Sequence, residues 1–285
     1  MTNVKGRDYM THSKVWFITG CSTGFGREIA KKVIAAGYKV VATARNVEHI
    51  RDLQELHPEN VQLLKLDVTD KEQVKDAVDQ AIESFGRIDV LVNNAGIGYF
   101  SSVEESVEEE TRKMFEINFW GLMAVTNEVL PHVRKQKSGH IINFSSISGL
   151  ASFPAVGYYN ATKYAVEGIS ESLAKEVAPI GIKVTLIEPG AFRTDWAGRS
   201  ANRTQTAIDD YQETVGKRIE RPSGTEEGDP EKLAEAVLHV AQSENPPLRL
   251  LLGAAAYELA YEKFTHLLED MAEWKEVTMN ADFKE

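Results

Sequence analysis

The sequence predicts an α/β fold in which a doubly wound parallel sheet is covered by helices on both faces. Short β-branched runs alternate along the chain with segments of helical periodicity, as parallel strands joined by crossover helices require. Several runs are apolar without alternation, which is typical of strands buried on both faces. No repeat or low-complexity linker divides the 285 residues, so we expect one domain, residues 1–285, with about seven strands.

The strands and helices follow one another in the order that this fold needs. The expected strands are Val15–Thr19, Lys39–Thr43, Val61–Leu66, Ile88–Val92, His140–Phe144, Lys183–Ile187 and Leu248–Leu252. The expected helices are Gly24–Ala36, Asp70–Phe85, Thr111–Lys135, Tyr158–Ala178 and Pro230–Gln242. Glutamates gather before the third helix, where negative charge complements the helix dipole.

Three segments fall outside this alternation. Residues 1–13 are expected to form a loose N-terminal arm. Residues 191–229 are rich in Gly, Ser, Thr and charge, and such a long irregular insertion predicts a lid over a substrate site. Residues 255–285 form an acidic, amphipathic C-terminal extension that either covers the core or offers a surface to a partner.

Charge and cysteine content limit the possible functions. The 32 basic and 43 acidic residues give a net charge of −11, which argues against nucleic acid or a membrane surface as the main partner. The single cysteine, Cys21, leaves no internal disulfide, and the N-terminus lacks the apolar core of a secretion signal. The seven histidines form no HxxxH or HExxH pair. We therefore expect a cytoplasmic protein with no metal site.

A glycine-rich loop follows the first strand. It reads Thr19-Gly20-Cys21-Ser22-Thr23-Gly24-Phe25-Gly26 and leads into a helix. Glycines allow a tight turn and let a pyrophosphate approach main-chain N–H groups at the helix N-terminus. The spacing differs from GxGxxG, and no Lys-Ser/Thr pair follows Gly26, which excludes a Walker A loop. A plain strand–helix turn is the alternative.

The residues after the second strand indicate which dinucleotide the loop would hold. An acidic residue at this point accepts hydrogen bonds from a ribose 2′-OH, whereas an arginine suits a 2′-phosphate. Ala44 and Arg45 offer a guanidinium and no carboxylate. They favour NADP(H) over NAD(H), unless Arg45 is merely a surface arginine.

A tyrosine and a lysine begin the fourth helix four residues apart. This spacing puts Tyr159 and Lys163 on one helix face. An ammonium near a phenol lowers the phenol pKa from about 10, which makes the tyrosine a usable general acid and base. Tyr158 has Thr162 at the same spacing and therefore no such charge.

Other polar residues follow the strands that should end beside Tyr159. Ser146 lies thirteen residues upstream, after strand His140–Phe144, and Asn93-Asn94-Ala95-Gly96 closes the fourth strand. Open α/β sheets bind ligands at the carboxyl ends of their strands, where the Ser146 hydroxyl would hold a substrate oxygen. Asn118 lies among Ile, Phe and Trp in the next helix. It is either a buried structural hydrogen-bonder or a residue that holds a water molecule.

Together these motifs resemble the short-chain dehydrogenase/reductase family. The TGxxxGxG loop, NNAG, the Asn118 segment, the Ser-then-YxxxK pair, and Pro189-Gly190 followed by Thr194 occur in the family's order and spacing. The matching strand–helix pattern extends to about Leu252. The resemblance implies a Rossmann-type fold and an oxidoreductase of the NADP-preferring branch, similar to hydroxysteroid- and retinol-type members and to carbonyl reductases.

The resemblance also implies roles for the matching residues. Ser146 would polarise a carbonyl oxygen, Tyr159 would protonate it, and Lys163 would lower the Tyr159 pKa and bind the nicotinamide ribose. Asn118 would hold a water that links Lys163 to solvent. The implied cofactor residues are Gly20, Ser22, Thr23, Gly24, Phe25, Gly26, Arg45, Asp67, Val68, Asn94, Ala95, Gly96, Tyr159, Lys163, Pro189, Gly190 and Thr194.

The expected reaction is NADPH-dependent reduction of a ketone or aldehyde. The same groups run NADP-dependent oxidation of a secondary alcohol, and a catalytically silent NADP(H)-binding regulator is a more distant alternative. Ser148, Phe153, Phe192 and Trp196 are the expected pocket residues. They favour an apolar small-molecule substrate, unless the aromatic side chains simply pack the insertion onto the core. A homodimer or homotetramer is possible on the family resemblance.

Overall fold

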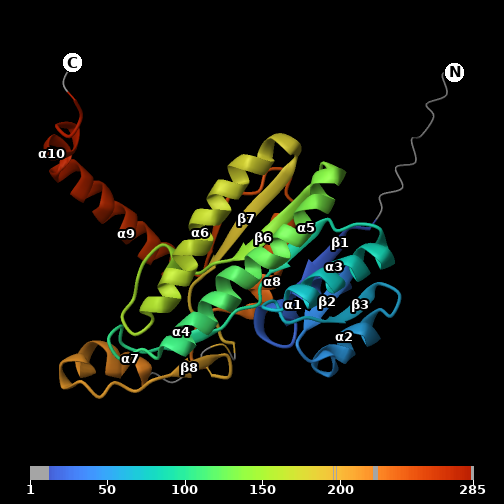
Figure 1. Cartoon of the computed structure of the whole chain (residues 1–285), viewed down its shortest axis with the longest axis horizontal. Coiled ribbons are helices and arrows are strands. Elements are labelled where there is room, and N and C mark those ends of the chain that lie inside the picture. The colour runs from blue at the N-terminus through green and yellow to red at the C-terminus, as the bar shows by residue number, and fades with distance from the viewer. Residues whose placement is uncertain (1–12, 195, 197, 221–223, 284–285) are drawn as a thin grey trace.

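A parallel sheet forms the centre of the protein (Figure 1). The computed structural model describes residues 13–194, 196, 198–220 and 224–283. In these ranges seven strands lie in the order β3-β2-β1-β4-β6-β7-β9, and every neighbouring pair is parallel. The order reverses between β1 and β4, where open α/β sheets bind ligands. The predicted doubly wound, Rossmann-type fold is confirmed.

Each strand of this sheet overlaps one of the predicted strands. The strands are β1 (Val15–Ile18), β2 (Lys39–Ala44), β3 (Val61–Lys65), β4 (Val90–Asn93), β6 (Gly139–Phe144), β7 (Ile182–Pro189) and β9 (Arg249–Leu252). β7 runs two residues past its predicted end and so contains Glu188 and Pro189. A small second sheet, which was not predicted, pairs β5 (Gly98–Phe100) with β8 (Ala201–Arg203).

Helices cover both faces of the sheet, and alternate strand residues enter two separate cores. Trp16 and Ile18 of β1 pack with α1 (Gly24–Ala35), α2 (Arg51–Leu56) and α8 (Pro230–Gln242). Phe17, between them, packs on the other face with α3 (Lys71–Phe85), α5 (Leu122–Gln136) and α6 (Gly157–Val177). Because successive strand residues point to opposite faces, an apolar run without alternation is required here.

The helix predicted over Thr111–Lys135 is interrupted. It consists of α4 (Glu108–Phe115), a π-helical turn over Glu116–Gly121, and α5. A π-turn adds a residue to the helical turn and often marks a functional site. Asn118 lies in this turn.

The remaining segments lie at the carboxyl edge of the sheet and beyond it. The segment 191–229 carries β8 and α7 (Lys217–Ile219) along this edge, and α9 (Ala254–Glu273) and α10 (Lys275–Met279) follow β9 and lead away from the sheet (Figure 1). Of the expected N-terminal arm only Ser13 is among the described residues. Within the described ranges every helix falls short of the length and apolarity needed to cross a bilayer.

Candidate active site

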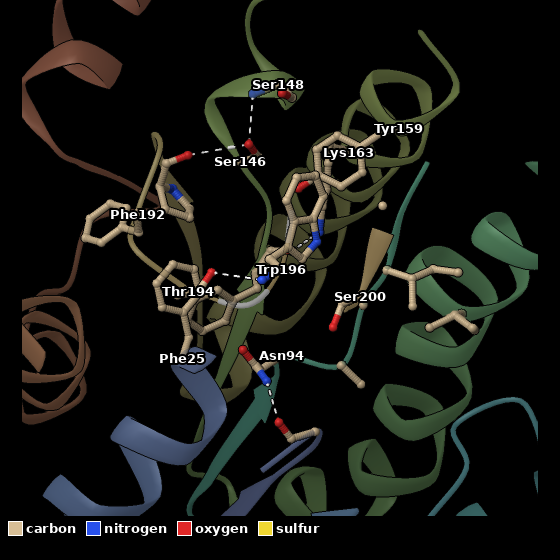
Figure 2. A pocket seen from close by; sticks show the side chains of 18 of the residues that line it. Phe25, Asn94, Ser146, Ser148, Tyr159, Lys163, Phe192, Thr194, Trp196 and Ser200 are labelled. Carbon is tan, nitrogen blue, oxygen red and sulfur yellow. Dashed lines mark hydrogen bonds between the residues drawn. The ribbon is translucent and has the colours of Figure 1, made fainter. Parts of the chain in front are cut away.

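A cavity of about 1070 Å³ opens at the carboxyl ends of β1, β2, β4, β6 and β7 (Figure 2). It is lined by every predicted site residue except Gly24, Gly26 and Asn118. Residues of the 191–229 segment, among them Trp196, Arg199 and Arg203, also line it. The sequence motifs therefore meet in one place, although they are far apart along the chain.

At Gly20 and Gly26 the glycine-rich loop has no room for a larger side chain. Gly20 has φ of +75°, and a Cβ there would lie 3.0 Å from Ala95 Cα. A Cβ on Gly26 would lie 2.4 Å from Asn94 Nδ2 and 2.5 Å from the Gly20 carbonyl oxygen. The loop is thus pressed against the end of β4, and the α1 N-terminus faces the cavity through Ser22 and Thr23. This is the backbone cradle that a dinucleotide pyrophosphate requires.

Asn94 joins this loop to β4. Its Nδ2 donates to the carbonyl oxygens of Thr19 and Gly20, at 2.9 and 3.1 Å. The Thr19 hydroxyl accepts from the main-chain N–H groups of Asn94 and Ala95, both at 3.0 Å. The Asn94 side chain thereby holds the glycine-rich loop against the end of β4 (Figure 2).

The ends of β2 and β3 form the far side of the cavity. Arg45, Asp67 and Val68 line it there, together with Asn46 and His49, which were not predicted. The Asp67 carboxylate accepts hydrogen bonds from the Thr69 N–H and hydroxyl groups, at 3.0 and 2.7 Å, which fixes the turn after β3.

Arg199 is a further residue that sequence reasoning did not single out. Its Nη2 donates to the Thr23 hydroxyl at 2.7 Å and so connects the 191–229 segment to the glycine-rich loop. A guanidinium at this point lies beside the cradle where a pyrophosphate would be bound. No local motif marks it, because the contact joins residues 176 positions apart.

Ser146, Tyr159 and Lys163 meet on the opposite wall (Figure 2). The Ser146 hydroxyl follows β6, accepts from the Ser148 N–H at 3.1 Å and donates to the Pro189 carbonyl oxygen at 3.4 Å. The Lys163 ammonium donates to the Phe144 carbonyl at 2.8 Å and lies 5.5 Å from the centre of the Tyr159 ring. The site thus combines two hydroxyl groups, those of Ser146 and Tyr159, with the ammonium group of Lys163 nearby.

The phenol pKa shifts in the direction opposite to the prediction. Burial raises the pKa of Tyr159 to about 12, and the hydrogen bond with Ser146 only partly offsets this. Burial also lowers the pKa of Lys163 to about 8, which weakens the charge that was expected to stabilise a phenolate. Tyr159 is therefore protonated at neutral pH, as a proton donor must be.

Asn118 is anchored by its side chain. Its Oδ1 accepts from the Ile97 N–H at 2.8 Å, and its Nδ2 donates to the Ile97 carbonyl at 2.9 Å and to the Thr162 hydroxyl at 3.3 Å. The π-turn thus directs this amide to the chain that leads into β5. These three contacts are those of a buried structural hydrogen-bonder, which is one of the two predicted alternatives.

Aromatic side chains cover Tyr159. The Trp196 ring lies 4.9 Å from the Tyr159 ring and 5.9 Å from that of Phe100. Phe192 instead packs edge-on against Phe25 at 5.4 Å, within the core below the loop. Trp196 thus has the position expected of a pocket wall, whereas Phe192 mainly packs the insertion onto the fold.

Two arginines that were not predicted lie on this aromatic wall. The Arg203 guanidinium lies 4.8 Å from the Phe100 ring, and that of Arg218 lies 5.0 Å from the Phe153 ring. Both residues line the cavity. Guanidinium groups stack favourably on aromatic faces, so they hold the wall in place.

Comparisons with known proteins identify the family. The family model for short chain dehydrogenases matches residues 14–206, from β1 through β8. The chain belongs to the short-chain dehydrogenase family. The match contains the glycine-rich loop, Asn94, Ser146, Tyr159 and Lys163.

Individual relatives match over nearly the whole chain. Oxidoreductase BOA17 of Botryotinia fuckeliana is 42% identical over 94% of this chain and 98% of its own length. A 3-ketodihydrosphingosine reductase of Bacteroides thetaiotaomicron is 36% identical over 92% and 96%. The crystal structure of a short-chain dehydrogenase from Streptomyces avermitilis superposes with a TM-score of 0.88 at 39% identity, over 95% and 99%. The protein is thus an oxidoreductase of this family.

Solved relatives with bound cofactor differ in the nicotinamide that they carry. ElxO, 28% identical over 86% of this chain and 99% of its own, with a TM-score of 0.72, holds NADP. An enzyme of Burkholderia phymatum, 25% identical over 92% and 95%, with a TM-score of 0.78, holds NAD. The fold therefore does not by itself decide between the two dinucleotides.

A buried acidic pair on α6 and β7, Glu167 and Glu188, was not predicted. Glu188 of β7 is fully buried, and Glu167 of α6, one helical turn after Lys163, is nearly so. Arg249 Nε contacts Glu167 Oε2 at 2.9 Å and Glu188 Oε1 at 3.6 Å. Burial, followed by the neighbouring Glu167 carboxylate, raises the pKa of Glu188 to about 8. The pair therefore keeps a proton at neutral pH.

Proposed function

We propose that this protein is a cytoplasmic enzyme that reduces a ketone or aldehyde to an alcohol with NADPH. The observation that carries the proposal is the juxtaposition of a protonated, buried Tyr159 with the Ser146 hydroxyl, in the cavity that also contains the glycine-rich cradle. A relative named as a reductase of a keto compound supports this reaction.

The residues present fit a dinucleotide. Gly20, Ser22 and Thr23 line the cavity at the N-terminus of α1, and Arg199 lies beside them through its hydrogen bond to Thr23. When bound there, the cofactor supplies the hydride that reduces the carbonyl carbon. Arg45, at the end of β2, supplies the positive charge that a 2′-phosphate prefers, which supports NADP(H) over NAD(H).

The side chains on the opposite wall then complete the reduction. Ser146 Oγ donates a hydrogen bond to the substrate oxygen, which polarises the carbonyl group. Tyr159 Oη gives its proton to the same oxygen as negative charge develops there. The Lys163 ammonium stabilises the phenolate that remains, which regains a proton from solvent. In the reverse direction the same groups oxidise a secondary alcohol, but a protonated Tyr159 favours reduction.

The shape of the cavity supports an apolar substrate. Trp196 and Phe100 pack next to Tyr159, and Phe153 lies in the same aromatic cluster. A carbonyl that reaches Ser146 is surrounded by these rings, which favour alkyl or aryl substituents.

The test is reduced-nicotinamide oxidation with a panel of aliphatic, aryl and steroid ketones, measured with NADPH and with NADH. We expect turnover with NADPH. Arg45→Asp should lower the binding affinity for NADPH by about tenfold or more and change the affinity for NADH little. Arg51→Asp, an exposed arginine outside the cavity, is the matched control. Equal effects on both cofactors would disprove the Arg45 assignment, and tight NADPH binding without any turnover would favour the regulator.

A further inference from the structure

The C-terminal helix α9 exposes most of its apolar residues. Only Ala256 and Ala260, in its first two turns, are buried against the fold. Farther along, Tyr261 is 67% exposed and Trp274, directly after the helix, is 60% exposed. Figure 1 shows α9 and α10 leading away from the sheet. A surface of this size on a folded protein marks an interaction site.

The exposed residues follow a regular spacing. Tyr257, Tyr261, Phe264, Leu268 and Met271 succeed one another at intervals of four, three, four and three residues, and all are exposed. This is the heptad spacing with which one helix packs against another. Leu267 and Trp274, both exposed, flank the same stripe seven residues apart. We call these seven residues the α9 seam.

The opposite face of α9 is acidic. It carries Glu262, Glu269, Asp270 and Glu273, with Lys263 as a basic neighbour. Helices that lie on membranes present Lys and Arg on their polar face, because cellular membranes are anionic. The acidic residues also point away from the seam, so two such helices can meet without bringing them together.

We propose that the α9 seam is the contact between two copies of this chain, with the two α9 helices antiparallel. An antiparallel pair that crosses at the level of His266 places Phe264 opposite Leu268 and Tyr261 opposite Met271, so that each aromatic ring meets an aliphatic side chain. The next position in the spacing, Lys275, falls opposite Tyr257, where its ammonium can lie on the ring. A parallel pair would instead put Lys275 against Lys275.

The area involved is that of a stable dimer. Twenty residues of helix extend over about 30 Å, and seven seam residues of this size cover about 800 Å² on each chain. Standard protein–protein interfaces bury about that much per partner. Two α9 helices therefore suffice without another surface of the molecule.

The contact would also act on the cavity. Ala255, Ala256 and Leu259, from the start of α9, line the cavity wall. A partner helix that holds the far part of α9 in place fixes this wall as well. The contact itself depends on no group that takes part in the reaction, so the proposal stands independently of the proposed function.

The first experiment measures molar mass by light scattering after gel filtration. The wild-type chain should have a mass of twice 31.7 kDa or a higher even multiple, and Leu268→Glu should halve it. His266→Glu, which adds the same charge on the exposed opposite side of α9, should leave it unchanged. A monomeric wild type, or a Leu268→Glu variant with the mass of the control, overturns the proposal.

The second experiment tests the direction of the pair by disulfide formation. The sole natural cysteine, Cys21, is fully buried, so engineered cysteines react alone. A double variant Tyr261→Cys/Met271→Cys should form covalent dimers on mild oxidation, because each new thiol faces the other position of the partner. Tyr261→Cys alone should not, since its two copies then lie about 15 Å apart. Cross-linking of the single variant, or none in the double variant, rejects the antiparallel arrangement.

Discussion

The two halves of the cavity are built from different material. The cofactor half consists of the glycine-rich loop, Asn94 and the ends of β1, β2 and β4. It is held together by hydrogen bonds between the Asn94 and Thr19 side chains and the main chain, and by close packing at Gly20 and Gly26. The substrate half consists of aromatic rings, chiefly Trp196 from the 191–229 segment and Phe100 from β5. The first should tolerate almost no added atom, whereas the second can change side chains and thereby change substrate.

The largest effect is expected where the two halves meet, at Tyr159. Tyr159→Phe removes the proton donor but keeps the ring on which Trp196 packs. We expect kcat to fall by about 10²- to 10⁴-fold, with the dissociation constant of NADPH nearly unchanged. Steady-state kinetics and a cofactor titration check this.

Tyr158→Phe is the control for this substitution. Tyr158 precedes Tyr159 on α6 but lacks a lysine four residues on, so its variant should remain active. Near-normal turnover of Tyr159→Phe would remove the proton-donor assignment, and equal losses in both variants would point to damage to the helix instead.

The next effect tests how rigid the cofactor half is. Gly26→Ala puts a methyl group 2.4 Å from Asn94 Nδ2, so the loop or Asn94 must move. We expect NADPH affinity to fall by at least about tenfold and the free energy of unfolding by about 1–3 kcal/mol. Fluorescence titration and thermal unfolding measure the two quantities.

Gly168→Ala gives the comparison. Gly168 lies within α6, and an added methyl group there would meet no neighbouring atom within 4 Å, so its substitution should be neutral or stabilising by about 0.5–1 kcal/mol. If both variants bind NADPH as the wild type does, the loop or Asn94 can move away from the new methyl group without loss of affinity. The cofactor half is then less rigid than proposed.

A smaller effect distinguishes two aromatic residues of the insertion. Trp196→Ala should raise KM for apolar ketones by about tenfold with little change in NADPH affinity, because the ring covers Tyr159. Phe192→Ala should instead lower the NADPH affinity with little change in KM, because Phe192 packs against Phe25 beneath the glycine-rich loop. The two variants are assayed with the same ketone and the same cofactor titration. Identical profiles would show that the division into halves does not extend to the insertion.

The difference between the halves also explains what could be predicted from the sequence. Gly20, Asn94 and the Tyr159–Lys163 pair depend on local backbone shape and on spacing within one helix, which the sequence displays directly. The family resemblance put the separate motifs at one sheet edge. The strands could be predicted from hydrophobic patterning alone, because each buried strand is a short apolar run that is visible in the sequence.

What could not be predicted depends on contacts between distant segments. Arg199, which contacts Thr23, and β8, which pairs with β5, both belong to the irregular 191–229 segment. No hydrophobic periodicity in this segment reveals where its residues lie. The Tyr159 pKa was predicted in the wrong direction, because spacing reveals the charge of Lys163 but not how deeply both groups are buried. Glu188 was missed because the predicted strand ended at Ile187, two residues before the end of β7.

The last prediction concerns the pKa of the buried Glu188 carboxyl group. Glu188 directly precedes Pro189 and Gly190, and burial with the Glu167 charge raises its pKa to about 8, whereas the unfolded chain titrates near 4.5. Between these values the folded protein keeps a proton that the unfolded chain releases. The contribution of Glu188 to stability is thus present at low pH and is lost as the pH rises toward 8.

Glu188→Gln removes this titration while keeping the shape of the side chain. Relative to the variant, the wild type should lose up to about 1.4 kcal/mol of unfolding free energy per pH unit between pH 5 and 8, measured by denaturant unfolding. Glu171→Gln is the control, because hydrogen bonds from Lys175 and Arg249 hold the Glu171 pKa at about 2, so that this carboxylate stays ionised over the whole interval and its difference should be flat. A flat difference for Glu188→Gln as well would mean that Glu188 is ionised in the folded protein, and that Arg249 neutralises both carboxylates beneath the cavity.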